Sequence, residues 1–123
     1  MPESPPEQKR PRSGLPPDQL EPWSVFSRIE ILLGQADTLE RLQRSKDRER
    51  KLLWGMAVVL DCLDAYPDSP LAPFSAAKIA RAAGRLEQAS RLLSRARKID
   101  REQILGNSVG YEENLLERER CDR

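Results

Sequence analysis

Residues 67–101 carry most of the structural information in this chain and read PDSPLAPFSAAKIARAAGRLEQASRLLSRARKIDR. Small residues line one side of the first half of this stretch: Ala76, Ala77, Ala80 and Ala83. Small side chains let two helices approach closely, and a glycine in the left-handed conformation commonly ends a helix. We therefore predict a helix that is capped by Ser69, has Pro70 and Pro73 near its start, and stops at Gly84.

A second helix is expected immediately after this glycine. Its predicted buried face consists of Leu86, Ala89, Leu92, Leu93 and Ala96. The three- and four-residue steps of these apolar positions are typical of an amphipathic helix. Because a tight turn joins the two helices, they are predicted to form an antiparallel helical hairpin.

This hairpin resembles the tetratricopeptide repeat, a 34-residue helix–turn–helix unit. The matching positions are Ala76, Ala77, Ala80, Gly84, Leu86, Ala89, Leu93 and Ala96. Pro67 matches the proline that closes the preceding repeat. The pattern departs from the family at Arg101, where the next proline is expected, at Pro73, where an aromatic residue is usual, and at Ala80, which replaces a tyrosine. An unrelated alanine-rich bundle would show a similar pattern.

One 34-residue period earlier, residues 36–69 fit the repeat only in part. Gly55 and Cys62 stand at small-residue positions of the second helix, whereas Arg50 stands where the turn glycine is expected. We interpret this segment as a degenerate unit that precedes the convincing one.

The resemblance implies a partner-binding groove lined by the first helix of each hairpin. Carried onto this sequence, the groove positions are Leu71, Phe74, Lys78 and Arg81. Phe74 would anchor an apolar side chain, while Lys78 and Arg81 would pair with carboxylates. The asparagine of the carboxylate-clamp repeats is missing, and Phe74 packing against the second helix remains an open alternative.

Upstream, apolar residues predict two further helices. The first follows a stripe with Ser24 as its N-cap and Gly34 as a kink or a close crossing: Phe26, Ile29, Leu32, Leu33, Ala36, Leu39 and Leu42. The second helix ends before Pro67 and has its own apolar stripe: Leu52, Met56, Val59, Leu63 and Tyr66. Residues 1–20 are proline-rich and lack an apolar cluster, so we predict a disordered tail there and a helical domain over residues 21–120.

The C-terminal part is predicted to form a last helix from about Val109 to Arg120. This helix would bury Leu115 and Leu116 and show its charged residues to water. Repeat arrays need a terminal element with one polar face, and this segment looks like such a cap.

The composition excludes several function classes. The chain is 33% charged and 38% hydrophobic and contains no histidine, which removes His-based acid–base catalysis, Ser-His and Cys-His nucleophile pairs and imidazole metal sites. Two cysteines cannot build a four-thiolate zinc site, and Cys62 is expected in the core. The carboxylates Asp61, Asp64, Glu112, Glu113 and Glu117 are expected to face water. We predict no enzyme, no catalytic residue, no metal or cofactor, and no small-molecule substrate.

Charge is unevenly distributed although the formal net charge is only +1. Arg91, Arg95 and Lys98 are predicted to share one outward helix face. This row is either a solvated surface or, as an alternative function, the contact of a nucleic-acid-associated regulator. The lack of interleaved aromatic residues disfavours a platform on which single-stranded bases stack.

Together these patterns predict an all-α protein with about five helices in a right-handed, tetratricopeptide-repeat-like stack. The expected function is protein–protein interaction as an adaptor, a chaperone or a small subunit of a larger assembly, with another protein or a second copy as partner. The longest apolar run, residues 52–60, is short of the roughly 20 residues of a membrane span, so no membrane insertion is expected. Without a signal-like N-terminus, a cytoplasmic location with reduced thiols is expected.

Overall fold

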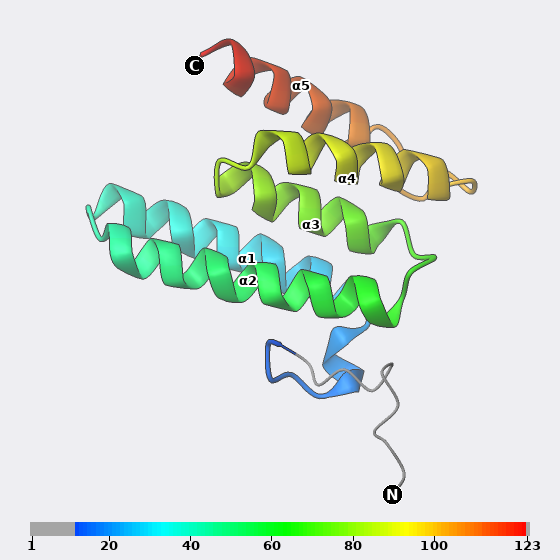
Figure 1. The fold of residues 1–123 in the computed structure, drawn as a ribbon, viewed down its shortest axis with the longest axis horizontal. Helices are drawn as coiled ribbons and strands as arrows, with labels where there is room; N and C mark the ends of the chain where they lie inside the picture. The colour runs from blue at the N-terminus through cyan, green and yellow to red at the C-terminus, as the bar shows by residue number, and fades with distance from the viewer. Residues whose placement is uncertain (1–11, 123) are drawn as a thin grey trace, which may run out of the picture.

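The computed structural model describes residues 12–122, which are helical throughout apart from the turns and the N-terminal approach (Figure 1). The elements are the 3-10 helix η1 (Pro17–Leu20) and the helices α1 (Pro22–Arg41), α2 (Ser45–Ala65), α3 (Leu71–Ala82), α4 (Leu86–Ile99) and α5 (Ser108–Cys121). The predicted all-α class with five helices is therefore confirmed. Among these helices, none has the length and the apolar character that crossing a bilayer would require.

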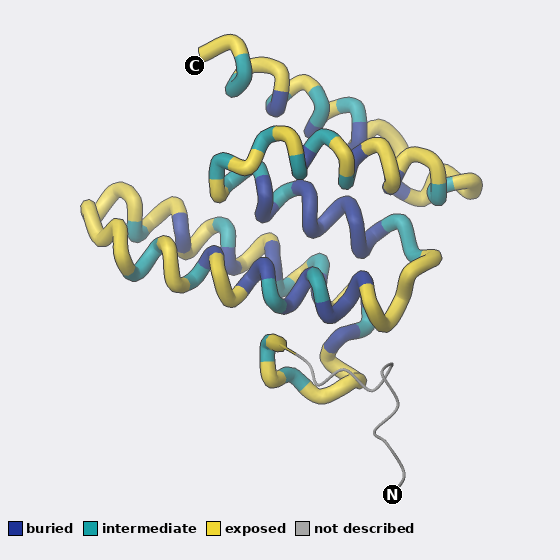
Figure 2. The backbone as a smooth tube through the Cα atoms, viewed as in Figure 1, coloured by how far each residue is buried: buried dark blue, intermediate teal, exposed yellow. Residues whose placement is uncertain are grey.

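The helices pack as two antiparallel hairpins and a final helix. Helix α1 pairs with α2, and α3 pairs with α4, while α3 also packs against both α1 and α2 and α5 lies on α4. Most of α3 is buried, as Figure 2 shows. Its run of alanines explains this position, because small side chains allow neighbouring helices to surround it closely.

The two hairpins close through the same kind of turn. The Arg85 N–H donates to Ala80 O at 2.8 Å, and the Arg44 N–H donates to Leu39 O at 2.9 Å. The residue before each donor has a positive φ, 79° at Gly84 and 59° at Gln43. This is the bond pattern in which a left-handed residue ends a helix, so the predicted role of Gly84 is confirmed.

The turn between α1 and α2 corrects the register predicted for the degenerate unit, residues 36–69. The counterpart of Gly84 is Gln43, whereas Arg50 lies inside α2. Helices α1 and α2 have 20 and 21 residues, against 12 and 14 in α3 and α4. The first hairpin is therefore longer than a 34-residue period allows, and residues 36–69 do not delimit a structural unit.

The close helix crossing occurs at Gly55 and not at Gly34. A Cβ atom on Gly55 would lie 2.7 Å from Ile79 Cδ1 and 3.0 Å from Leu32 Cδ1, whereas one on Gly34 would meet nothing within 4 Å. Gly55 thus lets α2 approach α1 and α3. Of the two roles expected of Gly34, a kink or a close crossing, the close crossing is wrong.

Both predicted N-caps are also corrected. Glu21 caps α1, because its carboxylate accepts the N–H groups of Trp23 at 3.0 Å and Ser24 at 3.1 Å. The hydrogen bond from the Trp23 N–H is the main cause of the lowered pKa of Glu21. Helix α3 is preceded by Pro70, and Ser69 contributes its main-chain carbonyl, which accepts the Ala72 N–H at 3.3 Å.

The packed part of the chain begins earlier than the predicted boundary at residue 21. Residues 12–20, which we call the N-terminal strap, lie against α1 and α2, with Leu20 buried and Leu15 packed on the core. The rest of the predicted tail, residues 1–11, lies outside the described residues.

Candidate functional site

A hollow of about 330 Å³ opens where α1, α3 and α5 meet. We call it the three-helix pocket; its lining residues are Phe26, Glu30, Phe74, Lys78, Asn107, Ser108, Tyr111 and Glu112. Each helix contributes because the first helices of the two hairpins lie side by side and α5 continues their row. The pocket therefore joins side chains that are far apart in the sequence.

Phe26, Phe74 and Tyr111 supply the aromatic rings of this pocket, and Trp23 packs on Phe26 without lining it. Phe26 and Phe74 are stacked with their centroids 6.1 Å apart, and Trp23 meets Phe26 edge-on at the same distance. Phe74 is buried, whereas Trp23 and Tyr111 are 56% and 65% exposed. The rings thus run from a buried centre to an accessible edge, and such an arrangement can receive an apolar side chain.

The charged groups of the pocket are largely paired with one another. The Lys78 ammonium lies 5.6 Å from the Phe26 centroid and 5.7 Å from the Phe74 centroid, in contact with the Glu30 carboxylate and 4.0 Å from Glu112. Because Glu112 is also paired with Arg81, the carboxylates of the pocket wall are balanced by cations of the chain, and Glu30 is the more exposed of the two.

Arg81 ties α5 to α3 beneath the pocket. Its Nε donates to Glu112 Oε2 at 3.0 Å, and its Nη1 donates to Glu119 Oε1 at 2.8 Å. Burial alone would lower the pKa of Arg81, but the hydrogen bonds to Glu119 and Glu112 outweigh it and the pKa is raised. Arg81 therefore remains charged and holds both carboxylates of α5.

The structure brings together two of the four predicted groove residues. Phe74 and Lys78 line the pocket, whereas Leu71 is buried in the core and Arg81 lies under α5. Both cations are bound to carboxylates of the chain itself, contrary to the expectation that they are free to pair with a partner. Phe74 packs against Phe26 of α1 and still forms part of the pocket.

Sequence reasoning missed most of the remaining lining. Glu112 was expected to face water, yet it is only 4% exposed, because it occupies a core-facing position of α5. The signal lies in its spacing: Val109, Glu112 and Leu116 step by three and four residues and are the buried positions of this helix. Glu30 and Tyr111 carry no comparable signal.

The predicted basic row on α4 is exposed. Within residues 12–122, Arg91, Arg95 and Lys98 form no ion pair. Arg97, in contrast, contacts Glu113 of α5. The acidic last helix thus neutralises other cations and leaves this row available.

The burial of Cys62 was predicted correctly, whereas the burial of Asp61 was not. Cys62 is buried as predicted, and burial raises the pKa of its thiol to about 12. Asp61, expected to face water, is only 6% exposed and binds the N-terminal strap. In the part of the chain from Arg12 to Asp122, no three acidic or cysteine side chains are grouped as metal ligands.

Comparison of the chain with protein-family models, with curated proteins and with solved structures finds no match.

Proposed function

We propose that this protein is a tetratricopeptide-repeat-like interaction module that binds an extended segment of a partner protein across the three-helix pocket. The packing of α1 and α3 side by side, with α5 next in the row, supports this proposal, because the groove of such repeats is lined by the first helix of each pair. The partner is another protein or a second copy of this chain, and the role is that of an adaptor, a chaperone or a small subunit.

The observation that carries the proposal is the exposed Tyr111 ring beside the aromatic floor of the pocket. Tyrosine is enriched at protein interfaces and among the residues that dominate their binding energy. The partner segment that fits best has an apolar side chain for Phe26 and Tyr111 and a neighbouring lysine or arginine. The basic residue would meet Glu30, whose side chain is 43% exposed although it contacts Lys78.

Selection of a displayed random-peptide library on the full chain tests this function. We expect enriched peptides that combine an apolar and a basic residue, and we expect Tyr111→Ala to weaken their binding about tenfold. Ile104→Ala is the matched control, because Ile104 is also an exposed apolar residue but does not line the pocket. The proposal fails if no peptide is enriched or if both variants bind equally well.

A second candidate is nucleic-acid association through Arg91, Arg95 and Lys98, and the exposure of this row, which has no ion partner within residues 12–122, supports it. Counter-ion release predicts that such binding falls steeply with added salt. Reversing the three charges to glutamate should abolish retention on DNA and RNA. Unchanged retention would remove this candidate.

We further propose that the protein works in the cytoplasm. Cys62 and Cys121 are free thiols, one buried and one exposed, which fits a reducing compartment. Fluorescent tagging in the source cell would test the location, and a signal outside the cytoplasm would contradict it.

A further inference from the structure

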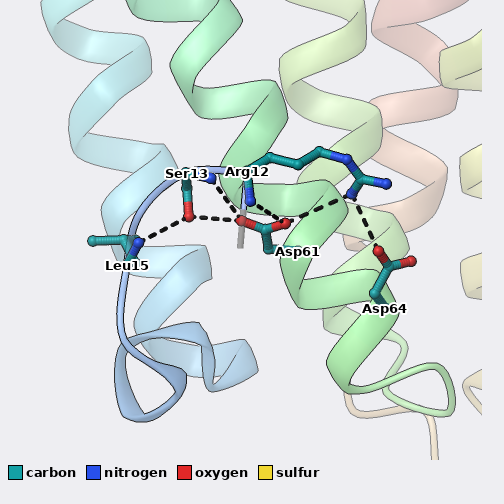
Figure 3. A network of polar contacts seen from close by, with 5 residues as sticks. All are labelled: Arg12, Ser13, Leu15, Asp61 and Asp64. Atoms are coloured by element: carbon teal, nitrogen blue, oxygen red, sulfur yellow. Dashed lines mark hydrogen bonds and ion pairs between the residues drawn. The ribbon is translucent and has the colours of Figure 1, made fainter. Parts of the chain in front are cut away.

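Asp61 of α2 binds the N-terminal strap through its carboxylate (Figure 3). Oδ1 accepts the Arg12 N–H at 2.9 Å, and Oδ2 accepts the Ser13 N–H at 2.8 Å. The Ser13 hydroxyl donates to the same Oδ2 at 2.7 Å. A nearly buried carboxylate thus holds two consecutive main-chain groups and the hydroxyl of one serine.

Every polar group of Ser13 takes part in this attachment. Its carbonyl accepts the indole N–H of Trp54 at 3.2 Å, and its hydroxyl oxygen accepts the Leu15 N–H at 3.3 Å. The neighbouring Arg12 guanidinium reaches Asp64 at 3.1 Å and Asp61 at 3.6 Å. Ser13 is therefore the residue on which the docking of the strap is centred.

The sequence around Ser13 has the character of a kinase substrate. It reads Lys9-Arg10-Pro11-Arg12-Ser13-Gly14, a basic run that would complement a kinase cleft lined by acidic residues. Ser13 lies outside any helix and is partly exposed. Ser94 also has an arginine three residues before it but lies in the interior of α4, where the main chain is already hydrogen-bonded.

We propose that Ser13 is a phosphorylation site and that its phosphorylation releases Arg12 and Ser13, the start of the N-terminal strap, from α2. The phosphoryl donor would be a nucleoside triphosphate bound by a serine kinase. The Ser13 hydroxyl oxygen forms a bond to the γ-phosphorus, and the bond from that phosphorus to the β,γ-bridging oxygen breaks. Nucleoside diphosphate leaves, and the hydroxyl proton passes to the base of the kinase.

The electrostatics of the docked state oppose the phosphorylated form. A phosphoserine carries a charge of about −1.5 to −2 and would stand against the carboxylate of Asp61, with Asp64 close by. The hydroxyl donor to Asp61 is lost at the same time. Arg12 pairs with Asp64 and Asp61, so a turn of its guanidinium to the phosphate would break contacts that attach it to α2. Leu15 and Leu20 hold the rest of the strap by apolar packing, so the release is confined to the segment around Ser13 and leaves the helices folded.

The test uses the full chain with phosphoserine encoded at position 13 and hydrogen exchange as the measurement. We expect the Arg12 and Ser13 amides to lose protection about tenfold or more, and the Trp54 indole signal to shift, while the amides of α3 keep theirs. Phosphoserine at Ser94 is the matched control and should leave the strap protected. Unchanged protection of Arg12 and Ser13 would overturn the proposal.

A second measurement examines the modification itself. The full chain is incubated with ATP and a purified serine kinase that selects arginine three residues before the serine, and the sites are mapped by mass spectrometry. We expect phosphate at Ser13 and its loss in Ser13→Ala. Phosphate at Ser94 without any at Ser13 would overturn the assignment.

Discussion

Arg81 of α3 and Glu112 of α5 form an ion pair in which Nε and Oε2 lie 3.0 Å apart, and the Glu112 side chain is only 5% exposed. Glu112 also faces Lys78 at 4.0 Å and lines the three-helix pocket. One carboxylate thus fixes the last helix against the central helix and forms part of the candidate site. The pocket consequently depends on the attachment of α5.

Replacing Glu112 should destabilise the fold more than replacing an exposed carboxylate of the same helix. Glu112→Ala leaves Arg81 and Lys78 without their shared partner, and we expect a loss of about 2–3 kcal/mol in the free energy of unfolding. Glu117→Ala, at an exposed position of α5, should cost under about 0.5 kcal/mol. Urea unfolding of both variants measures the difference, and equal midpoints would contradict the role of the pair.

Two glycines inside helices should respond differently to a larger side chain. Gly34→Ala adds a methyl group in open space and should raise stability by up to about 1 kcal/mol through helix propensity. Gly55→Val forces side-chain atoms toward Ile79 and Leu32 and should cost about 1–3 kcal/mol. Gly55→Ala should lie between them. Thermal unfolding of the three variants checks this order, and a stabilised Gly55→Val would refute the close crossing.

Substitutions at the two hairpin turns should change the stability in different directions. Gln43 has a φ of 59°, and a non-glycine residue pays about 1 kcal/mol for this conformation. Gln43→Gly should therefore be neutral or stabilising by up to about 1 kcal/mol, whereas Gly84→Ala should be destabilising by about as much. Denaturant unfolding distinguishes them. A destabilised Gln43→Gly together with an unaffected Gly84→Ala would show that the turns are not equivalent.

The two thiols should differ strongly in reactivity. Burial raises the pKa of Cys62 to about 12, whereas Cys121 is exposed at the end of α5. At pH 8 we expect iodoacetamide to modify Cys121 and to spare Cys62 until urea unfolds the chain. Because the folded state favours the protonated Cys62 thiol, stability should decrease as the pH rises above about 9, the ordinary value. Mass spectrometry of alkylated peptides provides the measurement; equal labelling of both cysteines would contradict the burial.

The helices themselves were predictable because local patterns encode them. The apolar spacing around Ile29, Val59 and Leu93 indicated three of the helices, and Gly84 marked a turn. The register of the first hairpin was not predictable from a repeat length, because Gln43 adopts the left-handed conformation without being a glycine. Only the neighbouring helices show that the turn lies there.

The pocket was only half predictable. Phe74 and Lys78 lie on the helix that the repeat pattern assigned to the groove, so the sequence predicted that both residues line it. Glu30 and Tyr111 come from helices that sequence alone could not place beside α3. Asp61 looked like a solvated residue near a helix end, and only the return of the strap over α2 explains its burial.

Chemical-shift mapping tests the central claim, binding of a partner segment in the three-helix pocket, most directly. The isotope-labelled full chain is titrated with a peptide enriched in the library selection. We predict the largest amide shifts at Phe26, Lys78 and Tyr111, with saturation at one peptide per chain and little change along the outer face of α4. Shifts concentrated at Arg91, Arg95 and Lys98, with the pocket unaffected, would contradict the account.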